Sequence, residues 1–181
     1  SYAYPEIILF CIIVVYLFAT LIISKDRIRE LNNFLALILT FLSFILFSQS
    51  FSGDAKVILN GMYVADSLSF FLKGACSLIV ALIIFFSSSY LEEMKITLGE
   101  NTLLVLFGLL GQFVMLSAYH LLTIYMGIEL LSLSLIALVA LKRDNSRSVE
   151  AAMKYFVLAA LASGFLLYGM SMLYGATGTL E

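Results

Sequence analysis

Long apolar runs separated by short polar stretches recur along the chain and predict six membrane-spanning helices. Each run has about 16 to 25 residues, enough at ~1.5 Å per residue to cross or nearly cross a ~30 Å hydrocarbon core. The alternation with a period of two that is typical of membrane β-barrels does not recur. We therefore expect an all-α, polytopic transmembrane helical bundle in which residues 1–181 form a single transmembrane region. The predicted spans are Ile7–Ile23, Asn33–Ser48, Leu68–Leu91, Thr102–Ala118, Leu121–Leu141 and Val149–Leu173.

Two connections between these spans carry structural signals of their own. Only Tyr119-His120 separates the fourth span from the fifth, which predicts a tight antiparallel pair of helices. The longest loop, residues 51–65, places Asn60-Gly61 between two β-prone triplets, the strongest short signal for a β-hairpin. Asp66 follows and is expected to cap the third helix.

Composition narrows the class of protein. Hydrophobic residues make up 62% of the 181 residues and charged residues only 12%, which excludes a soluble domain and predicts contact with membrane lipid. The net charge of -2 indicates no nucleic-acid partner. Cys11 and Cys76 lie inside apolar runs without CxxC spacing, so we expect inert thiols.

The basic residues predict how the chain is oriented in the membrane. Lys56 is the only basic residue in a loop on one side of the predicted topology. The loops on the other side contain Lys25, Arg27, Arg29, Lys95, Lys142, Arg143 and Arg147. Because basic loops face the cytoplasm, we expect both ends of the chain and the β-hairpin on the outer face.

Glu129 is the first candidate for a functional residue. It is the only charged residue of the run 121–141, and a carboxylate near the middle of a span costs at least ~2.5 kcal/mol. It lies about 12 Å below the outer boundary. Such a group can be a protonated packing device bonded to Ser132 or Tyr125, or a site that exchanges protons. The second interpretation is favoured because charges within spans usually serve a function.

Lys154, on the next span, is the second candidate. It can take part in ion or proton movement. Alternatively, it can pair with Glu150 one turn earlier and extend towards the cytoplasmic edge. Helix geometry puts Lys154 roughly 10 Å from Glu129 in depth, too far for a direct ion pair. Proton transfer between Glu129 and Lys154 would need water or another ionisable residue between them. The six predicted spans contain no such residue. Lys73 is expected to be an interfacial lysine, and His120 a solvated turn residue.

Three blocks of sequence resemble the subunit N family of bacterial NADH-quinone oxidoreductase, respiratory complex I. They are GIELLSL around Glu129, SVEAAMKYF around Lys154 and LYGATGTL near the end of the chain. The first two blocks also fit Mrp-type cation/proton antiporters, a related family of membrane subunits. The run ASGFLLYGMSMLYGATGTL favours subunit N, and DSLSFFLK at the third span fits the group.

The resemblance implies a proton-translocating membrane-arm subunit in the bacterial inner membrane. It assigns Glu129 to the acid of the proton channel and Lys154 to the same charged axis. It also implies no cofactor in this chain, with NADH, flavin, iron-sulfur clusters and quinone bound by other membrane and peripheral subunits. Members of the family have about fourteen spans and further lysines on later helices. Since the chain has no initiator Met and stops after six spans, we expect the N-terminal portion of a longer subunit.

Two rival functions stay open on the sequence. The first is a subunit of an Mrp-type antiporter, which genomic neighbours encoding redox subunits would exclude. The second is a structural membrane scaffold with incidental buried charges. Replacing Glu129 by Gln would leave proton pumping intact in a scaffold.

Overall fold

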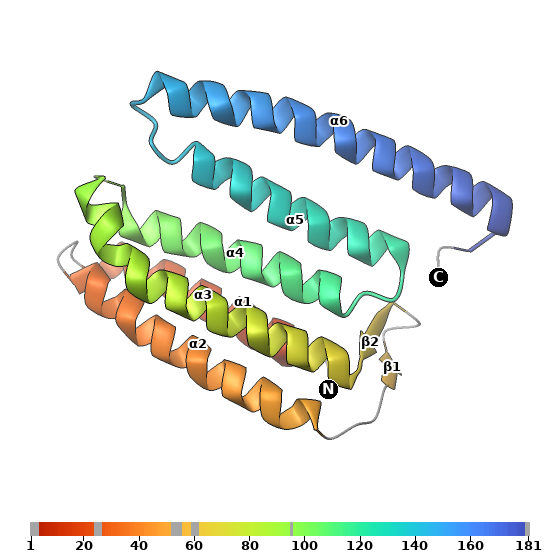
Figure 1. Ribbon diagram of the computed structural model, residues 1–181, viewed down its shortest axis with the longest axis horizontal. Coiled ribbons are helices and arrows are strands. Elements are labelled where there is room, and N and C mark those ends of the chain that lie inside the picture. The colour runs from red at the N-terminus through yellow and green to blue at the C-terminus, as the bar shows by residue number, and fades with distance from the viewer. Residues whose placement is uncertain (1–3, 24–26, 52–55, 59–61, 95, 180–181) are drawn as a thin grey trace.

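Helices make up most of the part of the chain that the structure describes, residues 4–23, 27–51, 56–58, 62–94 and 96–179 of a computed structural model. Two short strands lie between the second and third helices (Figure 1). In chain order the elements are α1 (Tyr4–Ile22), α2 (Ile28–Ser50), β1 (Lys56–Ile58), β2 (Tyr63–Ala65), α3 (Ser67–Glu93), α4 (Leu98–Leu116), α5 (Leu121–Val139) and α6 (Ser146–Thr177).

All six helices are long and apolar enough to cross a membrane, and each overlaps one predicted span. The largest differences are at the ends. α2 begins at Ile28 rather than Asn33, and α6 continues to Thr177 rather than ending at Leu173. Hydropathy reports only the apolar part of a helix, whereas backbone hydrogen bonding continues through polar turns. α6 ends where Gly178 adopts a φ of 75°, the left-handed conformation that favours glycine after a helix.

The segment before α3 forms the two short strands. β1 and β2 pair antiparallel, with Val57 opposite Val64. The predicted turn residues Asn60-Gly61 lie outside the described residues. The cap predicted at Asp66 is confirmed, because its carboxylate accepts a hydrogen bond from the Ser69 backbone nitrogen at 2.8 Å and a capping box forms. α3 therefore has a defined start immediately after β2.

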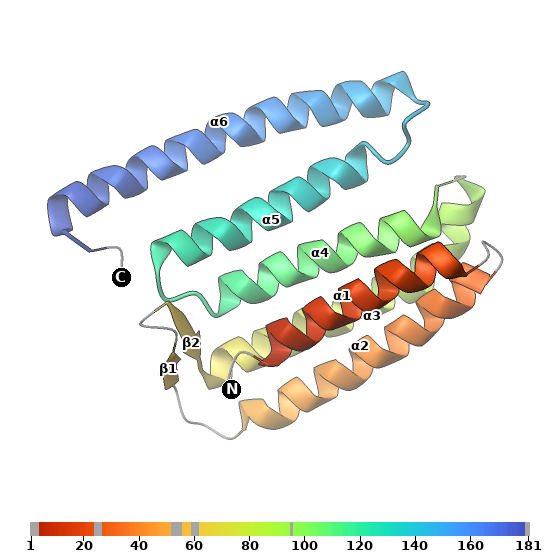
Figure 2. The ribbon, with the colours of Figure 1, turned by 180° about the vertical axis from the view of Figure 1, so that it is seen from behind.

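The helices form a bundle to which the last two are added in succession. α1 to α4 surround a core that includes the fully buried Leu9, Leu39, Leu106 and Phe113. α5 packs on α4, and α6 lies beside α5 on the side away from the core (Figure 1, Figure 2). We call the end with β1, β2 and the α4–α5 turn the strand end, and the end with the α5–α6 connection the loop end.

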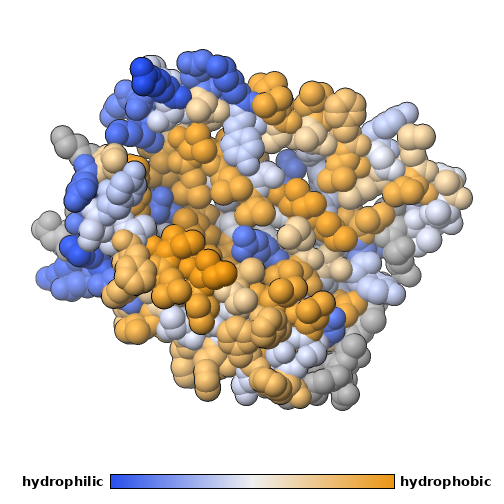
Figure 3. All heavy atoms as spheres, viewed as in Figure 1, coloured by the Kyte–Doolittle hydropathy of each residue, from blue (hydrophilic) through white to orange (hydrophobic). Residues whose placement is uncertain are grey.

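α6 has little protein around it. Of its described residues only Ala152 and Met170 are buried, and apolar side chains such as Phe156 and Phe165 are exposed. Figure 3 shows apolar residues over most of one face, with hydrophilic residues gathered near the α5–α6 connection. This distribution is suited to contact with lipid or with further apolar helices around α5 and α6, since lipid and apolar helices each provide apolar surroundings.

Candidate functional site

Glu129 is held by a chain of hydroxyl groups that joins α5 to α6. The Ser163 hydroxyl donates to Glu129 Oε2 at 3.0 Å, and Ser163 Oγ lies 2.9 Å from the Tyr125 hydroxyl oxygen. A serine hydroxyl has one hydrogen, so when it donates to Glu129, Tyr125 donates to Ser163. Glu129 itself is partly buried. The site is thus a carboxylate in a span with two hydroxyl groups aligned towards it.

This arrangement differs in detail from the partners that the sequence suggests. The donor to Glu129 is Ser163, from the neighbouring helix, rather than Ser132 one turn further on. Tyr125 contributes through Ser163 instead of directly. The sequence did not single out Ser163, because it lies between the small residues Ala162 and Gly164 in an apolar helix. The available signal was a serine among small residues on the helix that follows the one bearing Glu129.

Two glycines set how closely α5 approaches α4. A Cβ added to Gly127 would lie 2.9 Å from the Gly111 carbonyl oxygen, and one added to Gly111 would lie 2.8 Å from the Gly127 carbonyl oxygen. Any larger residue at either position would push the two backbones apart. A Cβ added to Gly164 on α6 would meet no atom within 4 Å, so α6 has no comparable close approach at that glycine. Glu129 follows Gly127 by less than one turn, which makes its position depend on this contact.

Lys154 lies on α6 but does not meet Glu129. Its ammonium nitrogen is 2.5 Å from Glu150 Oε1, and the two side chains are 72% and 64% exposed. This is the pairing one turn apart that the sequence offered as the alternative. Among the described residues no ion pair joins Lys154 to Glu129, as the expected difference in depth implied.

Lys73 is not the interfacial lysine that was expected. Its side chain is fully buried, and its ammonium nitrogen is 2.5 Å from Glu6 Oε1. It also lies 5.1 Å from the centre of the Tyr63 ring and 5.8 Å from that of Phe113. α3 turns this side chain inwards beneath β2, and α1 supplies the carboxylate. Because Glu6 is 67 residues away in the chain, local sequence pattern gave no sign of the pair.

His120 also has a more definite place than a solvated turn residue. It is the N-cap of α5, and its Nδ1 accepts a hydrogen bond from the Leu122 backbone nitrogen at 3.2 Å. A ring nitrogen that accepts carries no hydrogen, so the neutral ring is protonated on Nε2. The histidine therefore helps to start the helix that bears Glu129.

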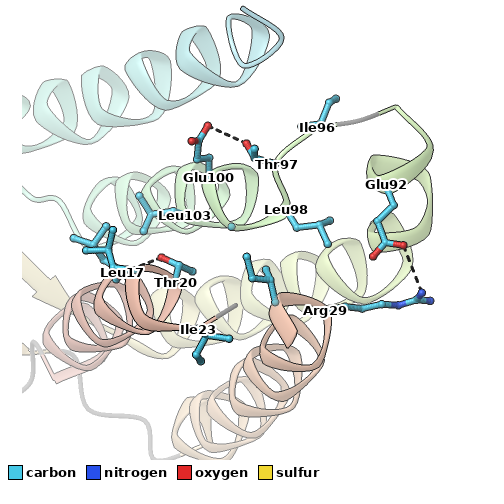
Figure 4. A pocket seen from close by; sticks show the side chains of 13 residues that line it. Leu17, Thr20, Ile23, Arg29, Glu92, Ile96, Thr97, Leu98, Glu100 and Leu103 are labelled. Atoms are coloured by element: carbon cyan, nitrogen blue, oxygen red, sulfur yellow. Dashed lines mark hydrogen bonds and ion pairs between the residues drawn. The ribbon is translucent and has the colours of Figure 1, made fainter. Parts of the chain in front are cut away.

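A cavity of about 950 Å³ lies at the loop end, away from Glu129. It is lined by the end of α1, the start of α2 and the segment that leads into α4 (Figure 4). Arg29 and Glu92 form an ion pair of 3.6 Å at its edge, and the Thr97 hydroxyl donates to Glu100 Oε2 at 2.9 Å. Neither Glu129 nor Lys154 lines this cavity, so it does not form part of the candidate site.

Comparisons with known proteins cover both the site and the whole chain. The family model for NADH:quinone oxidoreductase/Mrp antiporter, TM matches residues 118–181, which include Glu129, Lys154 and Ser163. NADH-quinone oxidoreductase subunit N of Nitrosomonas europaea is 46% identical over 99% of this chain. Subunit N of Alkalilimnicola ehrlichii is 44% identical over 100% of it. The chain spans 37% of the length of each of these two relatives.

Solved structures show the same fold. Respiratory complex I from Thermus thermophilus with bound aureothin contains a chain that matches with a TM-score of 0.73 and 28% identity, over 97% of this chain and 38% of that one. An archaeal membrane-bound sulfane sulfur reductase matches with a TM-score of 0.71 and 26% identity, over 99% of this chain and 37% of that one. Since relatives named subunit N match this chain over nearly its full length and a respiratory complex I chain shares its fold, the chain belongs to the NADH-quinone oxidoreductase subunit N family and corresponds to the N-terminal part of such a subunit.

Proposed function

We propose that the chain forms part of a proton-translocating membrane-arm subunit of NADH:quinone oxidoreductase in the bacterial inner membrane. The observation that carries the proposal is the site at Glu129. An ionisable group within an apolar helix is costly and marks an ion or proton path when it has polar partners directed at it. Ser163 and Tyr125 are such partners, and they lie in the segment that matches the antiporter family model.

The chemistry assigned to the site is proton exchange at the Glu129 carboxylate. A carboxylate can take up and release a proton as the charges around it change, and hydroxyl groups can both donate and accept hydrogen bonds along a path. In this proposal Ser163 and Tyr125 orient the carboxylate and extend the path towards α6. Oxidation of NADH and reduction of quinone take place in other subunits, which bind the flavin and the iron-sulfur clusters.

The experiment that tests this function measures protons pumped per NADH oxidised in the complete complex. Glu129→Gln should lower that ratio while the complex assembles, because glutamine retains the shape of the side chain and has no proton to release. An unchanged ratio together with an unchanged rate of NADH oxidation, at normal abundance of the complex, would instead favour the structural scaffold.

We also propose that Lys154 handles charge on the same axis, despite its exposed position on α6. The relatives are longer than this chain, so the exposed faces of α5 and α6 face either lipid or further protein in the complete subunit. In this chain Glu150 compensates the charge of Lys154 at 2.5 Å. A lysine with a carboxylate beside it can hold a proton or release it, depending on how strongly that carboxylate is engaged elsewhere.

Substitutions at Lys154 separate a proton-handling lysine from a fixed cation. We expect Lys154→Arg and Lys154→Ala both to lower NADH-driven proton pumping, because arginine stays protonated and alanine has no charge. Assembly should be retained, since an exposed pair one turn apart on a helix contributes only ~0.3–0.5 kcal/mol. The measurement is pumping by reconstituted complex, with Arg147→Lys as the conservative control on the same helix. Full activity with arginine would show that Lys154 needs only its positive charge.

The orientation of the chain is a proposal that rests on its charges. The basic loops, among them the one with Arg143, are assigned to the cytoplasmic side, and the strand end to the outer face. Both ends of this chain then lie on the outer side, and all of it belongs to a single transmembrane region. Lipid surrounds the apolar faces that other subunits leave uncovered.

Labelling with a membrane-impermeant thiol reagent tests the orientation. In a background that lacks Cys11 and Cys76, a cysteine at the exposed Tyr119 should react from the outer face of intact cells. A cysteine at Arg143, whose side chain is 82% exposed, should react only after the membrane is opened. Equal labelling of the two positions in intact cells would contradict the proposed topology.

A further inference from the structure

A closed polar network lies at the strand end, outside the Glu129 site. It consists of Glu6 on α1, Tyr63 on β2, Lys73 on α3 and Ser117 at the end of α4, and we call it the strand-end network. Lys73 Nζ donates to Glu6 Oε1 at 2.5 Å, to the Tyr63 hydroxyl at 3.0 Å and to Ser117 Oγ at 2.5 Å. The Tyr63 hydroxyl in turn donates to Glu6 Oε2 at 2.9 Å. Four separate elements therefore meet at one ammonium group.

The hydrogen bonds of Lys73 match a charged ammonium group that anchors its neighbours. An ammonium group has three hydrogens to donate, and here three oxygen atoms accept them. Loss of a proton would leave one of these buried oxygens without its donor and would leave the Glu6 carboxylate uncompensated. Burial also raises the pKa of the Tyr63 hydroxyl, which keeps it a donor to Glu6. Lys73 is thus placed to hold these four elements together.

What the network holds is the turn that leads into α5. Ser117 is the C-cap residue directly after α4, and its carbonyl oxygen accepts from the Val64 backbone nitrogen at 2.9 Å. The Tyr119 backbone nitrogen donates to the Met62 carbonyl oxygen at 3.1 Å. The turn is therefore tied to β2 through its backbone and to α3 through the side chain of Ser117. α5 begins at Leu121, directly after this turn.

We propose that Lys73 is a positioning residue for Glu129. By anchoring Ser117 it fixes the strand-end start of α5, while Gly111 and Gly127 fix the middle of that helix against α4. With both points fixed, the Glu129 carboxylate stays within reach of Ser163 on α6. This inference rests on the proposed function, since it assigns Lys73 a role in proton translocation through the placement of the acid.

The experiment removes the tie without leaving a buried charge unpaired. Glu6→Gln combined with Lys73→Met deletes both charges, and such double replacements of a buried pair are often tolerated. Ser117→Ala cuts the tie and leaves the ion pair intact. Both are made in the complete subunit within its complex. The readouts are hydrogen exchange at the Val64 and Tyr119 amides, and protons pumped per NADH oxidised. Ser88→Ala is the matched control, because this buried hydroxyl donates to the Ile84 carbonyl oxygen of its own helix.

The expected result is normal assembly of both variants with a loosened turn. Exchange at the two amides should become roughly tenfold faster. In these variants the turn can open locally without the cost of breaking the hydrogen bond between Lys73 and Ser117. Protons pumped per NADH oxidised should fall in both variants and stay unchanged in Ser88→Ala. Amide exchange at the control rate in both variants would overturn the anchoring role. Faster exchange with an unchanged proton ratio would overturn the positioning of Glu129.

The same assay separates this inference from the proposed function. Glu129→Gln tests the function alone, because it leaves the strand-end network untouched. If Glu129→Gln pumps normally, the proposed function fails and the role of Lys73 in it fails too. The amide exchange then still reports whether the network holds the turn. If Glu129→Gln abolishes pumping while the Lys73 and Ser117 variants pump normally, only the positioning role is overturned.

Discussion

Glu129→Gln is expected to slow proton transfer through this subunit by a factor of about 10² or more, the typical loss when a positioned acid-base group is removed. The amide oxygen of glutamine can still accept the hydrogen bond that Ser163 donates, so the packing of α5 against α6 is retained. The amide cannot titrate. The loss should therefore appear in proton pumping and in the rate that depends on it, with the complex present at normal abundance.

Two companion variants sharpen the test at Glu129. Ser163→Ala removes the donor to the carboxylate and should reduce pumping in the same direction by a smaller factor. Glu100→Gln is the control, because this carboxylate is exposed in the first turn of α4 and lies at the loop end. The measurement is proton uptake by vesicles together with NADH oxidation. Pumping in Glu129→Gln that equals the Glu100→Gln control would contradict a role in the channel.

Lys73→Met alone is expected to be the most destabilising single change in the chain. Removing one partner of a buried ion pair typically costs about 3–5 kcal/mol, because the remaining charge stays buried without compensation. Here that charge is Glu6, whose side chain is 13% exposed. Ser117 and Tyr63 would also lose the hydrogen that Lys73 donates to each of them. The change should lower the thermal unfolding midpoint and the amount of subunit recovered from membranes.

Exposed ion pairs provide the comparison for Lys73. Arg143 lies 3.9 Å from Glu100, with side chains 82% and 56% exposed, and such pairs contribute ~0–1 kcal/mol. Arg143→Met should therefore leave the unfolding midpoint nearly unchanged. Adding Glu6→Gln to Lys73→Met should recover much of the stability lost in the single variant. Equal midpoints for Lys73→Met and Arg143→Met would show that the buried pair does not stabilise the bundle.

The sequence by itself determined the class of fold and the acid at the centre of the candidate site. Apolar runs long enough to span a bilayer predicted the helices, because helix length and hydropathy are local properties. The cap at Asp66 was predictable for the same reason, since its partner Ser69 is three residues away. Glu129 stood out because a charge inside an apolar run costs free energy wherever the helix is placed.

Only the tertiary structure decided which side chains meet. A helix in a membrane is apolar on its lipid face and on its protein face, so hydropathy does not indicate which face packs inward. The sequence therefore did not distinguish a lysine near the membrane surface from Lys73 buried against Glu6, a residue 67 positions away. For the same reason it did not select Ser163 over Ser132 as the donor to Glu129. Those choices depend on how the helices lie beside one another, which local pattern does not encode.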